Sequence, residues 1–268
     1  MEHMLLDKIS EEIRKNKKVA WATITKIEGS TPRKEGAMMA IMEDGSIYGT
    51  VGGGTFEAVV VEQAKKCLQG GESKAFHFEL NDEEGSLHMQ CGGTADVFIK
   101  IFQPKDRLLI VGGGHIAVEL FKLGKMLGFY TVVFEDREDY LTYERFPDVD
   151  ELLLGNIEEQ LENYPMDEHC FVVIVTRGHR HDEVALMTVI SRDLGYVGMI
   201  GSKNKVGYVM DQMSEKDIPQ AWMKKVYAPI GLTLGGESPM EIAFSIISEI
   251  MAVKNGKKPG HMRDQMKE

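Results

Sequence analysis

Apolar residues along the first hundred positions follow two periods, one typical of helices and one typical of half-buried strands. Leucine and isoleucine recur at helical spacing over about residues 3–16, which predicts an amphipathic helix. The runs VAWATITKIEG, AMMAIMEDG and SIYGTVGGG, separated by turn residues, predict strands, two of them a hairpin. A second helix over about 55–68 and strands over about 74–80 and 95–102 complete a first unit.

The pattern changes after a polar, proline-containing break at residues 103–106. Strands that are apolar throughout then alternate with helices, in RLLIV, YTVVFE, DELLLG, FVVIV, YVGMI and KVYAPI, and a helix over about 239–253 follows. Such strands indicate a parallel sheet covered on both faces. We therefore predict an α/β protein with a mixed α/β domain over residues 1–103, a Rossmann-like doubly wound domain over 104–254 and a flexible tail over 255–268.

The charge balance disfavours two kinds of partner. Thirty-one Lys and Arg against 42 Asp and Glu give a formal net charge of −11, which repels nucleic acid and anionic lipid. No apolar run approaches the roughly 20 residues that span a bilayer, and the first residues lack the apolar core of a signal peptide. We expect a cytoplasmic protein that binds neither nucleic acid nor membranes.

A dinucleotide-type fingerprint, GGGHIA, directly follows the first strand of the second domain and opens a helix that includes His115. In this context Gly112 makes the turn, Gly114 lets a pyrophosphate approach the backbone, and Ala117 permits close packing of the helix. The pattern predicts a phosphate-bearing ligand. The alternative is a doubly wound domain that keeps the turn but binds another nucleotide, or nothing.

Acidic residues end the next strand about 20 residues later, where the ribose-binding carboxylate of a dinucleotide site is expected. These residues are Glu135 and Asp136. The neighbouring Arg137 could pair with them or bind a 2′-phosphate, so the pattern is compatible with a nucleotide, with NAD and with NADP.

A second glycine loop, GGGT, links a strand to a helix in the first domain. Its backbone amides could form an anion nest with Thr55 as the helix cap, or the glycines could simply make a tight turn. The loop GSTPRKEGA adds hydroxyl groups and Arg33, whose guanidinium can bind phosphate through two hydrogen bonds. Two anion sites in one chain suggest a large phosphorylated ligand.

Polar residues also follow two later strands of the second domain. His179, His181 and Asp182 could form part of a metal site, but no further ligand with recognisable spacing stands nearby, and we predict no metal. Capping of the helix by Asp182, with Arg180 or His181 facing a ligand, is the simpler interpretation. The candidate ligand-binding residues of both domains are Ser30, Thr31, Arg33, Gly52, Gly53, Gly54, Thr55, Gly112, Gly114, His115, Asp136, Arg137, Arg180, Ser202 and Lys203.

These motifs together resemble the xanthine dehydrogenase accessory factor family, also called the XdhC/CoxI family. The resemblance covers nearly the whole chain, through GSTPRKEGAMM, YGTVGGGTFEA and CGG in the first domain and LLIVGGGHIA, VTRGHRHDEVAL, YVGMIGSKNK and YAPIGLTLGGESPMEIAFSIISEIMA in the second. It implies a homodimeric cytoplasmic chaperone that binds the molybdenum cofactor, molybdopterin. Such a factor assists sulfuration of the cofactor by a cysteine desulfurase and its insertion into a xanthine dehydrogenase-type molybdenum hydroxylase.

The three cysteines lack the spacing of a zinc finger or disulfide framework. The family often has a cysteine where this chain has Thr55, and a doubled cysteine where it has Gln90 and Cys91. Cys91 is therefore the candidate for contacting molybdenum or carrying a persulfide, because a thiolate is both a nucleophile and a soft ligand. Cys67 and Cys170 stand in apolar surroundings, which predicts burial.

Two enzymatic alternatives remain. The first is an NAD(P)-dependent oxidoreductase, although no Ser-Tyr-x-x-x-Lys or comparable hydride-transfer group accompanies the fingerprint. The second is a metal-dependent hydrolase that uses His179 and His181.

Overall fold

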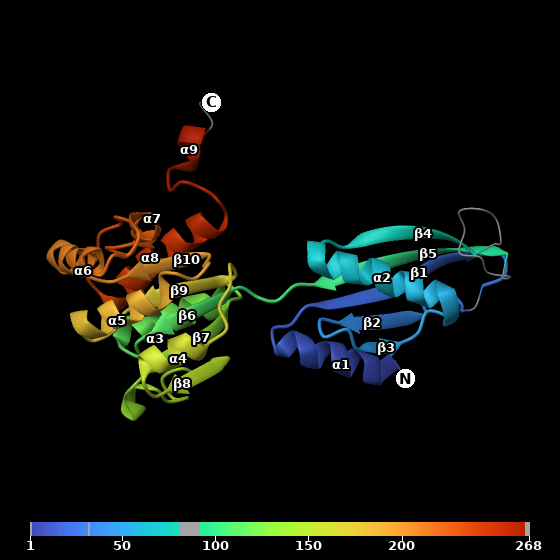
Figure 1. Ribbon diagram of the computed structural model, residues 1–268, viewed down its shortest axis with the longest axis horizontal. Coiled ribbons are helices and arrows are strands. Elements are labelled where there is room, and N and C mark those ends of the chain that lie inside the picture. Colours follow the sequence, from blue (N-terminus) through green and yellow to red (C-terminus); the bar gives the residue numbers. More distant parts are fainter. Residues whose placement is uncertain (1, 32, 81–91, 266–268) are drawn as a thin grey trace. The chain divides into compact units, whose positions relative to one another are not determined.

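The computed structural model of the protein describes residues 2–31, 33–80 and 92–265 (Figure 1). The chain divides into two compact units, Met1–Pro104 and Lys105–Glu268. Each has its own sheet and its own hydrophobic core.

The first unit is a five-stranded antiparallel sheet in the order β3-β2-β1-β5-β4. The long helix α2 covers one face, where Phe56 and Val60 pack among buried residues of β1 and β5. The amphipathic α1 packs Leu5 and Ile9 against Ala40 and its neighbours. The elements are α1 (Glu2–Arg14), β1 (Val19–Glu28), β2 (Met38–Met42), β3 (Ile47–Gly49), α2 (Gly54–Gly70), β4 (Lys74–Leu80) and β5 (Gly93–Phe102). The predicted hairpin is confirmed as β2 and β3.

The second unit is a six-stranded parallel sheet in the order β11-β10-β9-β6-β7-β8. This is the doubly wound order in which the chain turns back between β6 and β9. Its elements are β6 (Arg107–Val111), α3 (His115–Met126), β7 (Tyr130–Glu135), the 3₁₀ helix η1 (Glu138–Tyr140), β8 (Glu151–Leu154), α4 (Ile157–Asn163), β9 (Cys170–Ile174), α5 (His179–Val189), β10 (Tyr196–Met199), α6 (Lys203–Glu215), α7 (Gln220–Met223), β11 (Val226–Tyr227), α8 (Pro239–Lys254) and α9 (Met262–Gln265). The predicted fold class is confirmed. The sequence pattern did not predict the short α9.

Both faces of the parallel sheet are buried, which explains why its strands are apolar at every position. In β6, Leu109 and Val111 belong to the core beneath α4, α5 and α6, whereas Leu108 and Ile110 belong to the core beneath α3 and α8 (Figure 1). Successive side chains of a strand point to opposite faces, so a strand with helices on both sides needs apolar residues throughout.

The last long helix begins where its sequence predicts. Ser238 is the N-cap of α8 and accepts a hydrogen bond from the Glu241 amide, while the Glu241 side chain accepts one from the Ser238 amide. With Pro239 at the first turn, this capping box satisfies amides that the helix itself leaves free. None of the helices within the described ranges is both long and apolar enough to cross a membrane.

Candidate functional site

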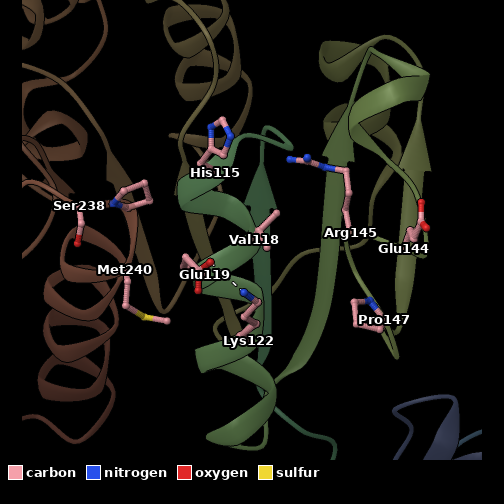
Figure 2. A pocket seen from close by; sticks show the side chains of 10 residues that line it. His115, Val118, Glu119, Lys122, Glu144, Arg145, Pro147, Ser238 and Met240 are labelled. Carbon is pink, nitrogen blue, oxygen red and sulfur yellow. Dashed lines mark hydrogen bonds and ion pairs between the residues drawn. The ribbon is translucent and has the colours of Figure 1, made fainter.

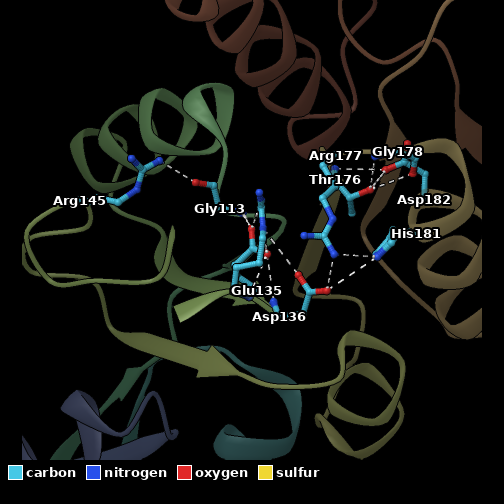
Figure 3. Close-up of polar contacts among 10 residues, drawn as sticks. Gly113, Glu135, Asp136, Arg145, Thr176, Arg177, Gly178, His181 and Asp182 are labelled. Atoms are coloured by element: carbon cyan, nitrogen blue, oxygen red, sulfur yellow. Dashed lines mark hydrogen bonds and ion pairs between the residues drawn. The ribbon is translucent and has the colours of Figure 1, made fainter. Parts of the chain in front are cut away.

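The candidate site lies at the carboxyl edge of the parallel sheet in the second unit. Here the loops after β6, β7 and β9 come together, and their polar groups form a continuous network (Figure 3). Because the crossovers from β6 and β9 run to opposite faces, a crevice opens at this edge in doubly wound sheets and is their usual ligand-binding place.

The three glycines of the fingerprint have different surroundings. Gly112 has φ +108°, and a Cβ added there would lie 2.7 Å from the Val175 carbonyl oxygen. A Cβ on Gly113 would lie 2.7 Å from the Tyr140 carbonyl oxygen, whereas one on Gly114 would meet no atom within 4 Å. The first two glycines are thus required by neighbouring backbone, and Gly114 faces open space.

Gly114 is also the N-cap of α3. A glycine cap has no side chain to bond the first amides of the helix, which lack carbonyl partners within it. The buried Ala117 lets the helix pack closely, as the fingerprint predicts. The start of α3 therefore presents amide donors beside an open approach, an arrangement that suits an anion.

Glu135 is buried and fully engaged within the protein. It accepts hydrogen bonds from the amides of Gly113 (2.7 Å) and Asp136 (3.0 Å), and from Arg137 through Nε (3.0 Å) and a terminal nitrogen (2.8 Å) (Figure 3). Burial alone would raise the pKa of Glu135, but these bonds and the positive charge of Arg137 lower it to about 2. The Arg137 guanidinium also lies 3.7 Å from the centroid of the Tyr140 ring. Of the two possibilities for Arg137, the structure shows pairing with an acid, and contact of Arg137 with a ligand stays a prediction.

Asp136 is the acid that remains accessible, with 29% of its side chain exposed. Its Oδ2 accepts a hydrogen bond from Arg177 at 3.0 Å and lies 3.7 Å from Nε2 of His181 (Figure 3). Arg177 was not among the predicted site residues. Its position directly after β9, at the same edge of the sheet, is the signal that would have found it.

Asp182 has a structural role that differs from the predicted one. Gly178 is the N-cap of α5, and the fully buried Asp182 carboxylate instead accepts hydrogen bonds from the amide (3.1 Å) and hydroxyl of Thr176 and pairs with Lys205. The prediction that Asp182 caps the helix is wrong, because its side chain joins the end of β9 to α6.

Removing the Asp182 carboxylate should destabilise the second unit strongly. We expect Asp182→Ala to lower the free energy of unfolding by about 3 kcal/mol, since it leaves the Lys205 ammonium without its buried partner. The change is measured by urea denaturation in a Trp21→Phe background, where Trp222 alone reports on the second unit. Glu183→Ala is the control, because it breaks a pair with the half-exposed Lys216 and should lower stability by about 1 kcal/mol or less. Equal losses would contradict the assignment.

His115 lies in a cavity of about 470 Å³ on the outer face of α3 (Figure 2). The side chains of His115, Glu119 and Lys122 stand on this face, between the loop that carries Arg145 and the start of α8. Arg145 donates a hydrogen bond to the Gly113 carbonyl oxygen at 2.8 Å. Arg145 is a second residue that the sequence did not indicate, because only the tertiary structure brings its loop to the fingerprint.

Of the other predicted residues in the second unit, one caps a helix and two are exposed at helix starts. The Ser202 hydroxyl caps α6 by accepting a hydrogen bond from the Lys205 amide at 3.3 Å. Lys203, at the first position of α6, is exposed, and so is Arg180 at the start of α5. Their contact with a ligand stays a prediction.

The glycine loop of the first unit does not form the free anion nest that its sequence suggested. Oε2 of Glu57 accepts hydrogen bonds from the Thr50 hydroxyl and from the amides of Val51 and Gly53, both at 3.2 Å. Burial would raise the pKa of Glu57, but these bonds lower it below its ordinary value. Thr55 is likewise not the cap, since Gly53 holds that position. The loop makes a strand-to-helix turn closed by its own carboxylate, and contact of Gly52, Gly54 or Thr55 with a ligand stays a prediction.

The GSTPRKEG loop places its cation near this turn. Arg33 is exposed and lines a pocket of about 170 Å³ together with Thr50. The Thr31 hydroxyl donates to the Arg33 carbonyl oxygen at 2.8 Å, and Ser30 is exposed. Arg33 thus shares a pocket with Thr50, which precedes the glycine loop, and contact of Ser30, Thr31 or Arg33 with a ligand stays a prediction.

The cysteines of the described chain are poor nucleophiles. Cys67 and Cys170 are buried, as predicted, and burial raises the pKa of both thiols, that of Cys170 to about 11. Cys91, the candidate for sulfur or molybdenum contact, lies outside the described residues. Within residues 2–31, 33–80 and 92–265, no three His, Cys, Asp or Glu residues are grouped to hold a metal ion.

The second unit is thus a Rossmann domain whose fingerprint loop keeps an open glycine beside an accessible acid. A family model described as the XdhC Rossmann domain matches residues 108–250, and one described as the XdhC and CoxI family matches residues 12–79. The chain belongs to the XdhC and CoxI family.

Two curated proteins are similar to this chain over most of its length. The chain is 34% identical over 248 residues to the uncharacterized protein YqeB of Escherichia coli (strain K12), covering 91% of this chain but only 45% of YqeB, so it spans about half the length of that relative. It is 25% identical to a probable xanthine dehydrogenase subunit of Bacillus subtilis (strain 168), covering 94% of this chain and 97% of that protein. The crystal structure of a xanthine dehydrogenase from Bacillus halodurans shares the fold, with a TM-score of 0.53 at 23% identity over 94% of this chain and 96% of that one.

Proposed function

We propose that the chain is an accessory factor that binds the molybdenum cofactor and assists its sulfuration and its insertion into a xanthine dehydrogenase-type molybdenum hydroxylase. The observation that carries the proposal is the open start of α3, where Gly114 leaves room for a ligand and the helix amides lack a side-chain cap. Membership of the XdhC and CoxI family and the name of the Bacillus subtilis relative support the choice of cargo.

The donor set suits the phosphate end of such a cargo. Molybdopterin carries a terminal phosphate, and an N-terminus of a helix favours negative charge through its free amides and dipole. His115, at the first position of α3, and Lys122, about two turns further along the same face, add hydrogen-bond donors to the adjacent cavity. In the first unit, Arg33 is the proposed anion contact, because Glu57 already accepts the loop amides.

The family resemblance of the CGG motif makes Cys91 the proposed residue for sulfur handling, and the other two cysteines do not compete for that role. Cys67 and Cys170 are buried and have raised thiol pKa values, so neither supplies thiolate at neutral pH. We propose that Cys91 contacts molybdenum or carries the persulfide received from a cysteine desulfurase. The proposed assembly is a homodimer that then meets the target hydroxylase.

Retention of freshly released cofactor tests the carrier function. Rapid filtration separates free from bound cofactor, and molybdenum and oxidised-pterin fluorescence are quantified together. We expect saturable, stoichiometric co-retention, weakened about tenfold or more by Gly114→Val, because a side chain there would block approach to the α3 amides, while its Cβ would meet no protein atom within 4 Å. Gly207→Val is the control, since Gly207 also has open space around its Cβ position but lies within α6.

Two further results would separate the steps of the proposed role. Cys91→Ser should retain cofactor but deliver less of the sulfurated form to the hydroxylase, while folding is unchanged. Absence of retention by the wild-type chain, with intact cofactor, would overturn the carrier function. Turnover of alcohols or hydroxy acids with NAD(P) would then favour the oxidoreductase alternative.

A further inference from the structure

The cavity on the outer face of α3 contains two buried polar atoms that have no hydrogen-bond partner within the described part of the chain. These atoms are Oε2 of Glu119 and Nε of Arg145. Native proteins bond nearly all of their buried polar atoms, because an unpaired one keeps its full desolvation penalty. The cavity volume of about 470 Å³ is within the range of small-molecule sites, which is roughly 300–1,000 Å³. The two atoms therefore point to a small molecule that enters the cavity and completes their hydrogen bonding.

The two residues offer an acceptor and a donor. Oε1 of Glu119 accepts a hydrogen bond from Lys122 at 2.9 Å, so only part of the carboxylate is in use (Figure 2). A carboxylate has about four acceptor positions and is able to accept from two neighbouring N–H groups of one ligand. A terminal nitrogen of Arg145 donates to the Gly113 carbonyl oxygen at 2.8 Å, which fixes the guanidinium and leaves its Nε donor unpaired.

Apolar side chains supply the rest of the lining. Val118 is half-buried on the outer face of α3, between the loop that carries Arg145 and the start of α8 (Figure 2). Met240 is 44% exposed at the start of α8, and two prolines complete the apolar part. Such surfaces suit a flat ring, and the sulfur of methionine makes favourable contacts with aromatic rings.

The charges around the cavity are mixed. His115, Lys122 and Arg145 stand beside the acids Glu119 and Glu144. A polyanion would meet like charge at both acids, whereas a neutral heterocycle with its own donors and acceptors would find a partner for each. The cavity reaches the residue after Gly114, so a ligand with its phosphate at the start of α3 can extend its ring along the helix.

We propose that this cavity binds the pterin ring of the cofactor. The Glu119 carboxylate accepts hydrogen bonds from the 2-amino group and from the adjacent ring N–H, and Arg145 or Lys122 donates to the 4-oxo oxygen. Lys122 is half exposed, so its side chain is able to move toward solvent and admit the ring to both carboxylate oxygens. This inference rests on the proposed carrier function and adds to it the residues that recognise the ring.

Fluorescence titration of the full chain with free pterin tests the assignment. The matched ligand is lumazine, which carries an oxygen in place of the 2-amino group. Pterin should bind saturably, and lumazine should bind about tenfold more weakly, because it loses a hydrogen bond to a charged acceptor and places an oxygen against it.

A pair of variants assigns the preference to one carboxylate. Glu119→Gln should weaken pterin binding about tenfold and abolish the preference over lumazine. Glu183→Gln is the control and should change neither. Glu183 lies outside the cavity and pairs with a half-exposed lysine as Glu119 does, with 15% of its side chain exposed against 20% for Glu119.

Three results would overturn the proposal. These are the absence of saturable pterin binding, equal affinity of the wild-type chain for pterin and lumazine, and an unchanged pterin preference in a folded Glu119→Gln variant. The wild-type comparison needs no variant, so it decides the matter even if Glu119→Gln is unstable. Guanosine presents the same amino and oxo groups, and tighter binding of guanosine than of pterin would overturn the assignment to a pterin.

Retention of the complete molybdenum cofactor separates this inference from the proposed function. Glu119→Gln should weaken that retention about tenfold, in parallel with free pterin. Equal retention by the wild type and by Glu119→Gln would overturn the ring assignment and leave the carrier function standing. Pterin binding by a wild-type chain that retains no cofactor would contradict the carrier function alone.

Discussion

Replacing Glu135 by alanine is expected to lower the free energy of unfolding of the second unit by about 4 kcal/mol. The substitution leaves the buried Gly113 amide without an acceptor and removes both contacts that hold the Arg137 guanidinium. Urea denaturation followed by Trp222 fluorescence in the Trp21→Phe background measures the change. Glu138→Ala, an exposed acid of η1, is the matched control and should shift stability by about 0.5 kcal/mol or less.

The same carboxylate should contribute to unfolding by acid. Its pKa is about 2 in the folded chain against the ordinary 4.5, so the stabilisation is fully present above about pH 4.5 and is lost as the pH falls through 2. The difference corresponds to about 3 kcal/mol, as an order of magnitude. Between pH 5 and 2.5, Glu135→Gln should therefore lose less stability than the wild type. An identical pH dependence in both proteins would show that Glu135 is not the group that titrates.

Substitution of two glycines only two positions apart should change the stability of the second unit by very different amounts. Gly112→Val is expected to destabilise the second unit by about 3 kcal/mol or more, because φ of +108° strains any side chain and its Cβ would lie 2.7 Å from the Val175 carbonyl oxygen. Gly114→Val should leave stability within about 0.5 kcal/mol, since its φ of −70° suits valine and its Cβ position is open.

Thermal melting and ligand retention together distinguish the two glycines. Gly112→Val should lower the melting temperature of the second unit, while Gly114→Val should melt like the wild type and lose ligand binding. A stable Gly112→Val variant would contradict the close contact with Val175. A destabilised Gly114→Val variant would show that this glycine, too, serves the fold.

The helices and strands of both units follow from local sequence patterns that agree with their tertiary environment. In the parallel sheet, residues such as Leu108 and Leu109 are both apolar because each face has its own helical layer. The helix of residues 239–254 is equally readable, since Ser238, Pro239 and Glu241 form its start from within four consecutive positions. Short-range geometry is sufficient in such cases.

Where the structure differs from the sequence predictions, the cause is that the candidate groups bond partners within the protein, some close in sequence and some distant. The amides around Gly53 bond Glu57, and Arg137 pairs with Glu135. Asp182 pairs with Lys205, which is 23 positions away. A sequence pattern shows which groups are able to bind an anion, but it does not show which of them already form hydrogen bonds or ion pairs within the protein.

By itself, the sequence determined the α/β class, the parallel sheet of the second unit, the turn at Gly112 and the family to which the chain belongs, because these depend on periodicity, on backbone conformation and on motifs within short segments. Only the tertiary structure decided which of the candidate groups remain accessible. In the folded chain, Glu135 and Glu57 accept hydrogen bonds from donors within the protein, and Arg177 donates to Asp136. Gly114 has open space at its Cβ position. The physical reason is that a buried polar group must find a partner, and the partner is chosen by the packing of strands and loops that are distant along the chain.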